Sequence, residues 1–145
     1  MGKITFFSEG IRFRPPNTVA LRKGIFSFFE SEGKSAGEIN YIFCNDDYLL
    51  EMNRIYLQHD TLTDIITFDL TEEGEVNLCA DIFISVERVR ENADKLGFAF
   101  ETELQRVMIH GVLHLLGYDD KTTDEQKTMR QKEEKFLNRL IPKTL

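Results

Sequence analysis

Hydrophobic residues recur along the chain with two spacings, and each spacing predicts one kind of element. Alternating or clustered apolar and β-branched residues predict strands at residues 3–7, 10–13, 38–43, 63–70 and 78–85. Apolar residues at helical spacing predict helices at residues 17–31, 45–57, 86–96, 101–116 and 122–140. Strands and helices mix in the first part of the chain, and only helices follow. We therefore expect an α+β fold in which a small mixed β-sheet packs with about five helices.

Polar residues mark the start of three predicted helices. Asn17 or Thr18 is placed to cap the first helix, and Asn45 to cap the second. Thr102 and Gln105 match the Ser/Thr-x-x-Glu/Gln capping box, in which each side chain bonds the backbone of the other residue. These matches predict where the chain enters each helix.

The predicted helix at residues 101–116 contains two of the three histidines. His110 and His114 are four residues apart, and a helix with 3.6 residues per turn places such a pair on one face. Gly117 follows, where a left-handed residue can end the helix, so that Asp120 could close the site from the side. Similar spacings define the metzincin zinc motif. The pattern predicts a zincin-like metal site on a buried helix, with His110, His114 and Asp120 as ligands.

A purely structural role for these histidines is the alternative. The helix is apolar nearly all round, so each imidazole could be a core group with a satisfied hydrogen bond. Two buried imidazoles without a shared partner would each cost roughly 1–3 kcal/mol. This cost favours the metal site. Asp119 is an alternative ligand, although the spacing favours Asp120.

Length and composition bound the class of protein. At 145 residues we expect a single domain over residues 1–145. Hydrophobic residues make up 41% of the chain and charged residues 30%, as in ordinary soluble proteins, and no apolar run approaches the roughly 20 residues of a membrane span. The first residues lack the features of a secretory signal. We therefore expect a cytoplasmic protein that does not contact membranes.

The charge is acidic and unevenly distributed. The net charge of −7 argues against a protein that coats nucleic acid nonspecifically. No Lys or Arg occurs between Ile55 and Glu87, whereas the first 24 residues contain five basic residues and the single acid Glu9. A polyanion is therefore expected to approach from the basic side.

Three blocks of residues resemble the YbeY family of bacterial metal-dependent endoribonucleases. Residues 110–119, His-Gly-Val-Leu-His-Leu-Leu-Gly-Tyr-Asp, are similar to its signature His-Gly-x-Leu-His-Leu-x-Gly-Tyr-Asp-His. Asn53 with residues 63–68, Thr-Asp-Ile-Ile-Thr-Phe, is similar to its Thr-Asp-Val-Leu-Ser-Phe segment. Residues 80–84, Ala-Asp-Ile-Phe-Ile, are similar to its Gly-Asp-Ile-x-Ile strand. The blocks occur in the family's order, which makes the resemblance specific.

The resemblance implies a function. It implies a single-strand-specific endoribonuclease that acts in rRNA maturation and ribosome quality control, with metal-bound water attacking a phosphodiester. It implies one Zn²⁺ ion per chain at His110, His114 and Asp120, and other divalent metals also accept such donors. RNA, in particular rRNA in the ribosome, is the implied partner, together with ribosomal or GTPase proteins.

Two positions depart from the family pattern. Asp120 stands where the signature ends in His, a mild change because Zn²⁺ binds carboxylate oxygen and imidazole nitrogen at similar distances. Leu57 stands where an Arg usually follows the aromatic residue, here Tyr56. If that Arg binds a phosphate in relatives, Arg54 or His59 must bind RNA in its place, or activity is reduced.

The residue after the first histidine is also informative. Hydrolytic zincins have a Glu general base there, whereas this chain has Gly111. Asp64 and His59 are the candidates for a catalytic role in its place. Asp64 fits equally well as a cap or as a carboxylate that orients a ligand imidazole, and an exposed His59 is more often simply solvated. Asp81 fits a hydrogen-bonding anchor for the backbone of the site.

Two other functions stay open. With Gly111 and Leu57 in place of a base and an Arg, the protein could be a ribosome assembly factor with structural zinc and little catalysis. A metallopeptidase is favoured by the spacing of the histidines and opposed by the missing Glu. Metal analysis and an RNA cleavage assay would separate the three.

Overall fold

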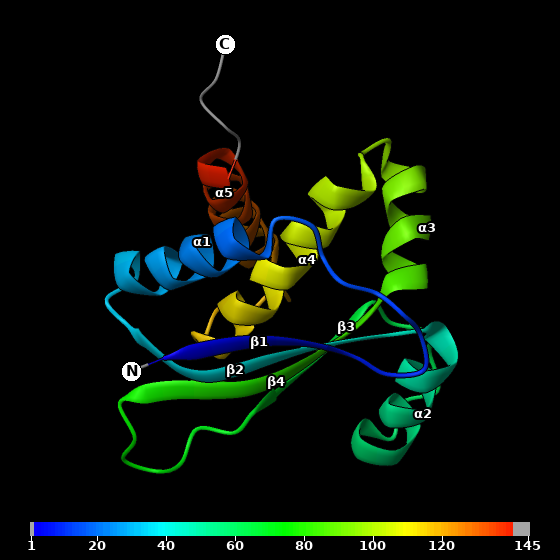
Figure 1. Ribbon diagram of the computed structural model, residues 1–145, viewed down its shortest axis with the longest axis horizontal. Helices are drawn as coiled ribbons and strands as arrows, with labels where there is room; N and C mark the ends of the chain where they lie inside the picture. Colours follow the sequence, from blue (N-terminus) through cyan, green and yellow to red (C-terminus); the bar gives the residue numbers. More distant parts are fainter. Residues whose placement is uncertain (1, 141–145) are drawn as a thin grey trace.

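A four-stranded mixed sheet and five helices form the part of the chain that the computed structural model describes, residues 2–140. The elements are β1 (Lys3–Ser8), α1 (Thr18–Ser31), β2 (Ser35–Cys44), α2 (Asp46–Leu57), β3 (Ile65–Asp69), β4 (Asn77–Ser85), α3 (Val86–Leu96), α4 (Phe100–Leu115) and α5 (Thr123–Leu140). The predicted α+β class is confirmed (Figure 1). The outer limits of the predicted domain, residues 1 and 145, lie outside the described residues.

The sheet has the strand order β1-β2-β4-β3. β1, β2 and β4 run parallel, and β3 pairs antiparallel with β4 at one edge. Parallel neighbours need a crossover connection, which α1 provides between β1 and β2. Residues along each strand alternate between the two faces of the sheet, so each face can bury its own set of side chains.

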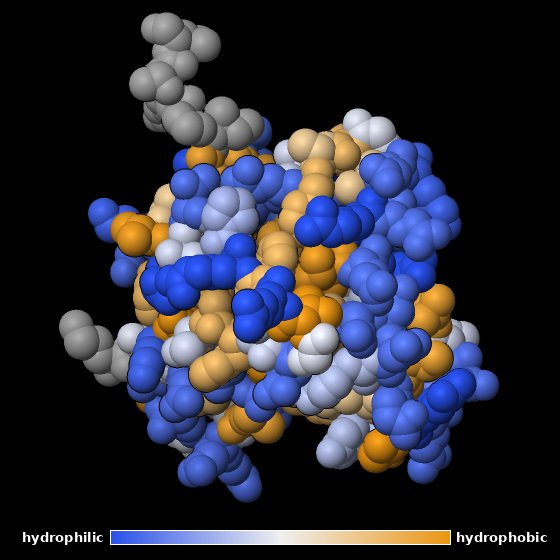
Figure 2. Space-filling model, turned by 45° about the vertical axis from the view of Figure 1, so that its right-hand side comes forward, coloured by the Kyte–Doolittle hydropathy of each residue, from blue (hydrophilic) through white to orange (hydrophobic). Residues whose placement is uncertain are grey.

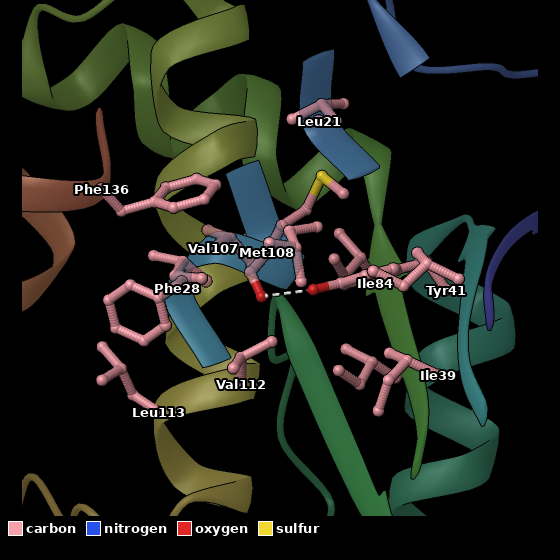
Figure 3. Packing of buried hydrophobic residues seen from close by; sticks show 14 of the residues in the cluster. Leu21, Phe28, Ile39, Tyr41, Ile84, Val107, Met108, Val112, Leu113 and Phe136 are labelled. Atoms are coloured by element: carbon pink, nitrogen blue, oxygen red, sulfur yellow. Dashed lines mark hydrogen bonds between the residues drawn. The ribbon is translucent and has the colours of Figure 1, made fainter. Parts of the chain in front are cut away.

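One face of the sheet is covered by α1 and α4, and α5 packs on these two helices, whereas α2 lies against the other face (Figure 1). Figure 3 shows side chains of α4, among them Val112, packed between residues of the sheet and residues of the other two helices. The labelled residues from those elements include Ile39 and Tyr41 on β2, Phe28 on α1 and Phe136 on α5. A smaller cluster under α2 contains Cys44, Leu49 and Ile66. α4 is therefore the central, buried helix, as its apolar sequence predicts.

The position of α4 on the sheet is set by two contacts. The hydroxyl of Tyr41 donates a hydrogen bond to the backbone oxygen of Met108 at 2.9 Å (Figure 3). A Cβ atom at Gly111 would lie 2.9 Å from Cδ1 of Ile65 and 3.1 Å from Cγ2 of Ile82. A side chain there would force Ile65 and Ile82 to shift, so glycine favours the close approach of the helix to β3 and β4.

Two sequence predictions about local structure were wrong. Residues 10–13 form no strand. Ile11 and Phe13 pack against the main core from a loop, and this burial explains why the segment is apolar. Thr102 is not a cap, since α4 begins at Phe100 and its N-cap is Ala99. Asn45 does cap α2, because its side chain accepts a hydrogen bond from the backbone N–H of Tyr48 at 2.9 Å.

None of the helices within residues 2–140 has the length and apolar character that crossing a membrane requires. Cys44 and Cys79 are both free thiols, and Cys44 is buried whereas Cys79 is only partly so.

Candidate metal centre

The three residues that spacing selects as ligands lie together at the C-terminal end of α4. The Nε2 atoms of His110 and His114 are 3.0 Å apart. Oδ2 of Asp120 lies 3.4 Å from Nε2 of His110 and 3.5 Å from Nε2 of His114. These donor atoms form a triangle in which one ion can contact all three, so this group could hold a metal. Asp119 does not belong to this group.

The chain folds back toward the histidines because α4 ends in a Schellman motif. Gly117 has φ of 101°, a left-handed conformation that glycine adopts without strain. Its N–H donates to the oxygen of His114 at 3.0 Å, and the N–H of Tyr118 donates to the oxygen of Leu113 at 3.0 Å. The side chain of Gln126 then binds the backbone oxygen of Asp120 at 3.0 Å, which holds the returning segment.

The donor set fits a small divalent cation. Zinc lies about 2.0–2.1 Å from imidazole nitrogen, so two ligands of a tetrahedral ion are about 3.3 Å apart. The observed separations of 3.0, 3.4 and 3.5 Å bracket this value. Two imidazoles and one carboxylate are also typical of catalytic zinc sites, which keep a further position for water or substrate. An octahedral ion with similar bond lengths fits nearly as well, so the geometry does not select one metal.

A buried carboxylate on α5 orients His110. Oε2 of Glu133 lies 2.7 Å from Nδ1 of His110, and the side chain of Glu133 is buried. This contact places the imidazole proton on Nδ1 and leaves Nε2 free to bind a cation, an arrangement that recurs around metal-binding histidines. The sequence analysis missed Glu133. Its position four residues after Met129 and three before Phe136, on the apolar stripe of an otherwise polar helix, is the signal that could have found it.

The negative charge of Glu133 is balanced inside the protein by an arginine on α4. Nη1 of Arg106 lies 3.4 Å from Oε1 of Glu133, and its Nε lies 3.3 Å from Oε1 of Glu103. All three side chains are largely buried. Burial raises the pKa of Glu103 above its ordinary value, although the charge of Arg106 acts in the opposite direction. The charges behind His110 therefore form a paired network, as burial requires.

Protons compete with a metal for His110. Burial by itself lowers the pKa of this imidazole, but the hydrogen bond and charge of Glu133, with the charges of Asp120 and Asp64, outweigh burial. The net result is a pKa above the ordinary histidine value. The second proton of the charged imidazole sits on Nε2, and a metal must displace it. Metal affinity is therefore expected to fall as the pH decreases.

Asp64 lies beside the metal centre without belonging to it. Its charge and that of His110 influence each other, but its carboxylate accepts a hydrogen bond from Nδ2 of Asn92 at 3.5 Å. Burial raises the pKa of Asp64, and this effect exceeds the opposing influence of His110 and Asn92. Asp64 is therefore a partly buried carboxylate near the site whose affinity for protons is increased. Its catalytic role stays a prediction.

The other candidates have different surroundings. The backbone N–H of His59 donates to the oxygen of Asn53 at 3.1 Å at the end of α2, and its exposed side chain is in none of the ion pairs or hydrogen bonds of residues 2–140. Nε of Arg54 lies 2.6 Å from Asp60. Asp81 accepts a hydrogen bond from Asn40 at 3.0 Å on the neighbouring strand. Asp81 thus joins β2 to β4 and does not anchor the backbone of the site.

A side chain at the position where zincins have their general base would require its neighbours to shift. Gly111 faces β3 and β4 across contacts that a Cβ atom would make too short. The arrangement therefore lacks the Glu of a zincin peptidase, and its neighbours would have to shift to admit one. Proton transfer at this site must use a residue from another element.

Comparison with known proteins identifies the family and agrees with the fold. The chain matches the family described as Endoribonuclease YbeY over residues 9–141. It is 58% identical to the Endoribonuclease YbeY of Flavobacterium psychrophilum over 131 residues, which span 90% of this chain and 92% of that protein. For the Endoribonuclease YbeY of Flavobacterium johnsoniae the identity is 47%, with 90% and 93% covered.

A solved structure shares the fold. The solution structure of a Thermotoga maritima protein superimposes with a TM-score of 0.65 and 29% identity, over 95% of this chain and 89% of that one. The family match spans nearly the whole chain, and it includes β3, β4 and the two histidines of α4. The chain therefore belongs to the Endoribonuclease YbeY family.

Proposed function

We propose that the protein is a zinc-dependent, single-strand-specific endoribonuclease that acts on rRNA in the cytoplasm, in ribosome maturation and quality control. The observation that supports this proposal best is the triangle of donor atoms from His110, His114 and Asp120. Membership of a family whose relatives bear the name endoribonuclease supports RNA as the substrate. The ribosome, with its proteins and GTPases, is the proposed setting.

Metal binding, imidazole orientation and proton transfer are assigned to different residues of the chain. His110, His114 and Asp120 would hold the ion, and Glu133 keeps the imidazole of His110 in the required orientation. A divalent ion held there would supply Lewis acidity and make water a nucleophile at neutral pH. Asp64 is the proposed proton acceptor, because burial raises the pKa of its carboxyl group toward the range where a general base is effective.

A ribosome assembly factor with structural zinc is the second candidate. Two observations favour it: a side chain in place of Gly111 would require its neighbours to shift, and Arg54 is paired with Asp60 at 2.6 Å. In this alternative the metal stabilises α4 and the segment after it, and RNA cleavage is slight. A metallopeptidase has no comparable support, because its Glu is missing.

The test combines metal analysis with cleavage of a single-stranded RNA. Wild-type protein should contain about one zinc per chain, and EDTA treatment should abolish cleavage that added zinc then restores. His114→Ala and Asp120→Ala should lose both metal and cleavage, because each removes one donor. His59→Ala should retain the metal, because this third histidine contributes no donor atom to the triangle.

The outcomes separate the candidates. Stoichiometric metal without metal-dependent cleavage would favour the assembly factor over the enzyme. Metal retained in full by Asp120→Ala would remove Asp120 from the ligand set. A protein that binds no divalent metal would contradict both candidates.

A further inference from the structure

An open pocket beside the candidate metal donors contains an arginine. The pocket has a volume of about 260 Å³, and its walls come from His110, Asp120, Gln126, Met129, Arg130 and Glu133. Two of these residues are proposed metal ligands, so a molecule in the pocket lies next to the ion. Pockets for drug-sized ligands are usually larger, about 300–1,000 Å³, so this one suits a smaller chemical group.

Arg130 reaches this pocket because of the face of α5 that it occupies. Gln126, Arg130 and Glu133 follow each other at spacings of four and three residues, which places them on one side of the helix. Gln126 binds the backbone of Asp120 at 3.0 Å, and Glu133 contacts His110 at 2.7 Å. Arg130 therefore lies on the helix between two residues that contact the proposed metal ligands.

The charge of Arg130 is not neutralised by a carboxylate. Within residues 2–140, no Asp or Glu oxygen lies within ion-pair distance of its guanidinium. Its neighbour Glu133 is instead paired with Arg106 and His110. The side chain of Arg130 is exposed to solvent.

Two other arginines, on α2 and α3, already have carboxylate partners. Nε of Arg54, which precedes the uncharged Leu57 on α2, lies 2.6 Å from Asp60, and its Nη1 lies 3.8 Å from Glu51. Arg88 lies 2.8 Å from Asp46. Binding an anion would cost Arg54 or Arg88 an existing ion pair, whereas Arg130 has none to lose.

We propose that Arg130 binds a phosphate of the RNA backbone in this pocket, beside the reacting phosphodiester. The planar guanidinium presents two parallel N–H groups that match two non-bridging phosphate oxygens. The proposal rests on the ribonuclease function proposed above, and it assigns to α5 a phosphate contact that Leu57 cannot make. Arg130 is thus a substrate-binding residue and not a ligand of the metal.

The test compares Arg130→Gln with Lys127→Gln, an exposed cation three residues earlier on the same helix. In zinc-loaded protein, Arg130→Gln should lower kcat/KM for a single-stranded RNA by roughly 10–100-fold, the range for one charged hydrogen bond. Its zinc content should equal that of wild type. Arg130→Lys should lose less activity than Arg130→Gln, because lysine keeps the charge but lacks the two parallel N–H groups of the guanidinium. Lys127→Gln should behave as wild type.

A second readout makes the proposal independent of cleavage. Inorganic phosphate is titrated into zinc-loaded wild type and Arg130→Gln, and binding is followed by ³¹P NMR line broadening. Weaker binding by Arg130→Gln alone supports the phosphate contact even if wild type cleaves no RNA, a result that would contradict only the ribonuclease function. If wild type cleaves RNA and Arg130→Gln matches Lys127→Gln in both assays, the proposal is overturned. Loss of zinc from Arg130→Gln would also overturn it, because the residue would then be structural.

Discussion

Glu133 shows how much one side chain outside the recognised motif contributes to the candidate site. Its carboxylate is buried, lies 2.7 Å from Nδ1 of His110 and is balanced by Arg106. A buried charge is costly unless it has such partners. The two contacts therefore make Glu133 stable in its position, and the imidazole of His110 is held with Nε2 directed toward Asp120.

At the residue scale we predict that Glu133→Gln weakens metal binding. The amide keeps the size of the side chain but loses the charge that favours the required form of His110. Zinc affinity should fall by about 10–100-fold, as is typical when a carboxylate behind a metal-binding histidine is lost. Competition with a chromophoric chelator measures the affinity. Glu134→Gln, the exposed neighbour on the same helix, is the control and should match wild type; equal affinities in all three proteins would contradict the prediction.

The donor residues and their support differ in how far they could be predicted. His110, His114 and Asp120 lie within one helix and the turn after it, so local spacing indicates that they converge. Glu133 is 23 residues from His110 and meets it only because α5 packs on α4. Its place on the apolar stripe with Met129 and Phe136 indicates that it is buried, but the sequence does not indicate which residue it contacts.

At the scale of elements, some helix ends are determined by residues within one turn, and others depend on how the preceding chain runs. Asn45 and Gly117 were predicted correctly, because their side-chain and backbone bonds involve residues within one turn. The capping box predicted at Thr102 was wrong, since Gln105 bonds Glu101 at 3.3 Å inside the helix. The actual box is Thr122 with Glu125: Oγ1 of Thr122 accepts from the N–H of Glu125 at 3.1 Å, and Glu125 accepts from the N–H of Thr122 at 2.9 Å. Both Thr-x-x-Glu/Gln pairs match the sequence pattern. Whether such a pair forms a capping box depends on where the helix begins, and that depends on the path of the preceding chain.

This difference between the two threonines gives a prediction. Thr122→Ala should lower the free energy of unfolding by about 1 kcal/mol, because it removes a cap bond at the start of α5. Thr102→Ala should change it by less than about 0.5 kcal/mol, because Thr102 lies inside the first turn of α4. Urea unfolding of the metal-free proteins measures both values. Equal losses in the two variants would show that the capping box at Thr122 contributes no specific stability.

At the scale of the whole molecule, the sequence predicts the kinds of element and leaves their arrangement open. A small mixed sheet follows from the order of strands and helices, but the same alternation is compatible with strand orders other than β1-β2-β4-β3.

Figure 2 shows hydrophilic residues over most of one face, with smaller hydrophobic patches between them. With a net charge of −7, long-range forces repel RNA, so its binding must depend on local contacts such as the one proposed for Arg130.

The pH dependence of stability should reverse when the metal is present. In metal-free protein the pKa values of Asp64, Glu103 and His110 are all raised, so the folded state binds protons more tightly than the unfolded state. The contribution of these three groups to stability therefore falls as the pH rises, first above the ordinary carboxyl values and then above about 6.5, through the titration of His110. With excess zinc, stability should instead rise between about pH 6 and pH 8, because protons no longer compete for the ligands.

Urea unfolding at several pH values, with EDTA or with zinc, checks this reversal. Metal-free His110→Gln is the control, and it should lose the part of the slope that lies above about pH 6.5. A stability that changes with pH in the same direction with and without zinc would contradict the prediction.

The contact between Glu133 and His110 also has a consequence for the order of events during synthesis. All three donor residues are made before Glu133, since they end at Asp120 and the chain grows toward α5. The first imidazole can be oriented only after α5 has been made and has packed on α4. Strong, selective metal binding is then a property that the chain gains late, when its last described helix has docked.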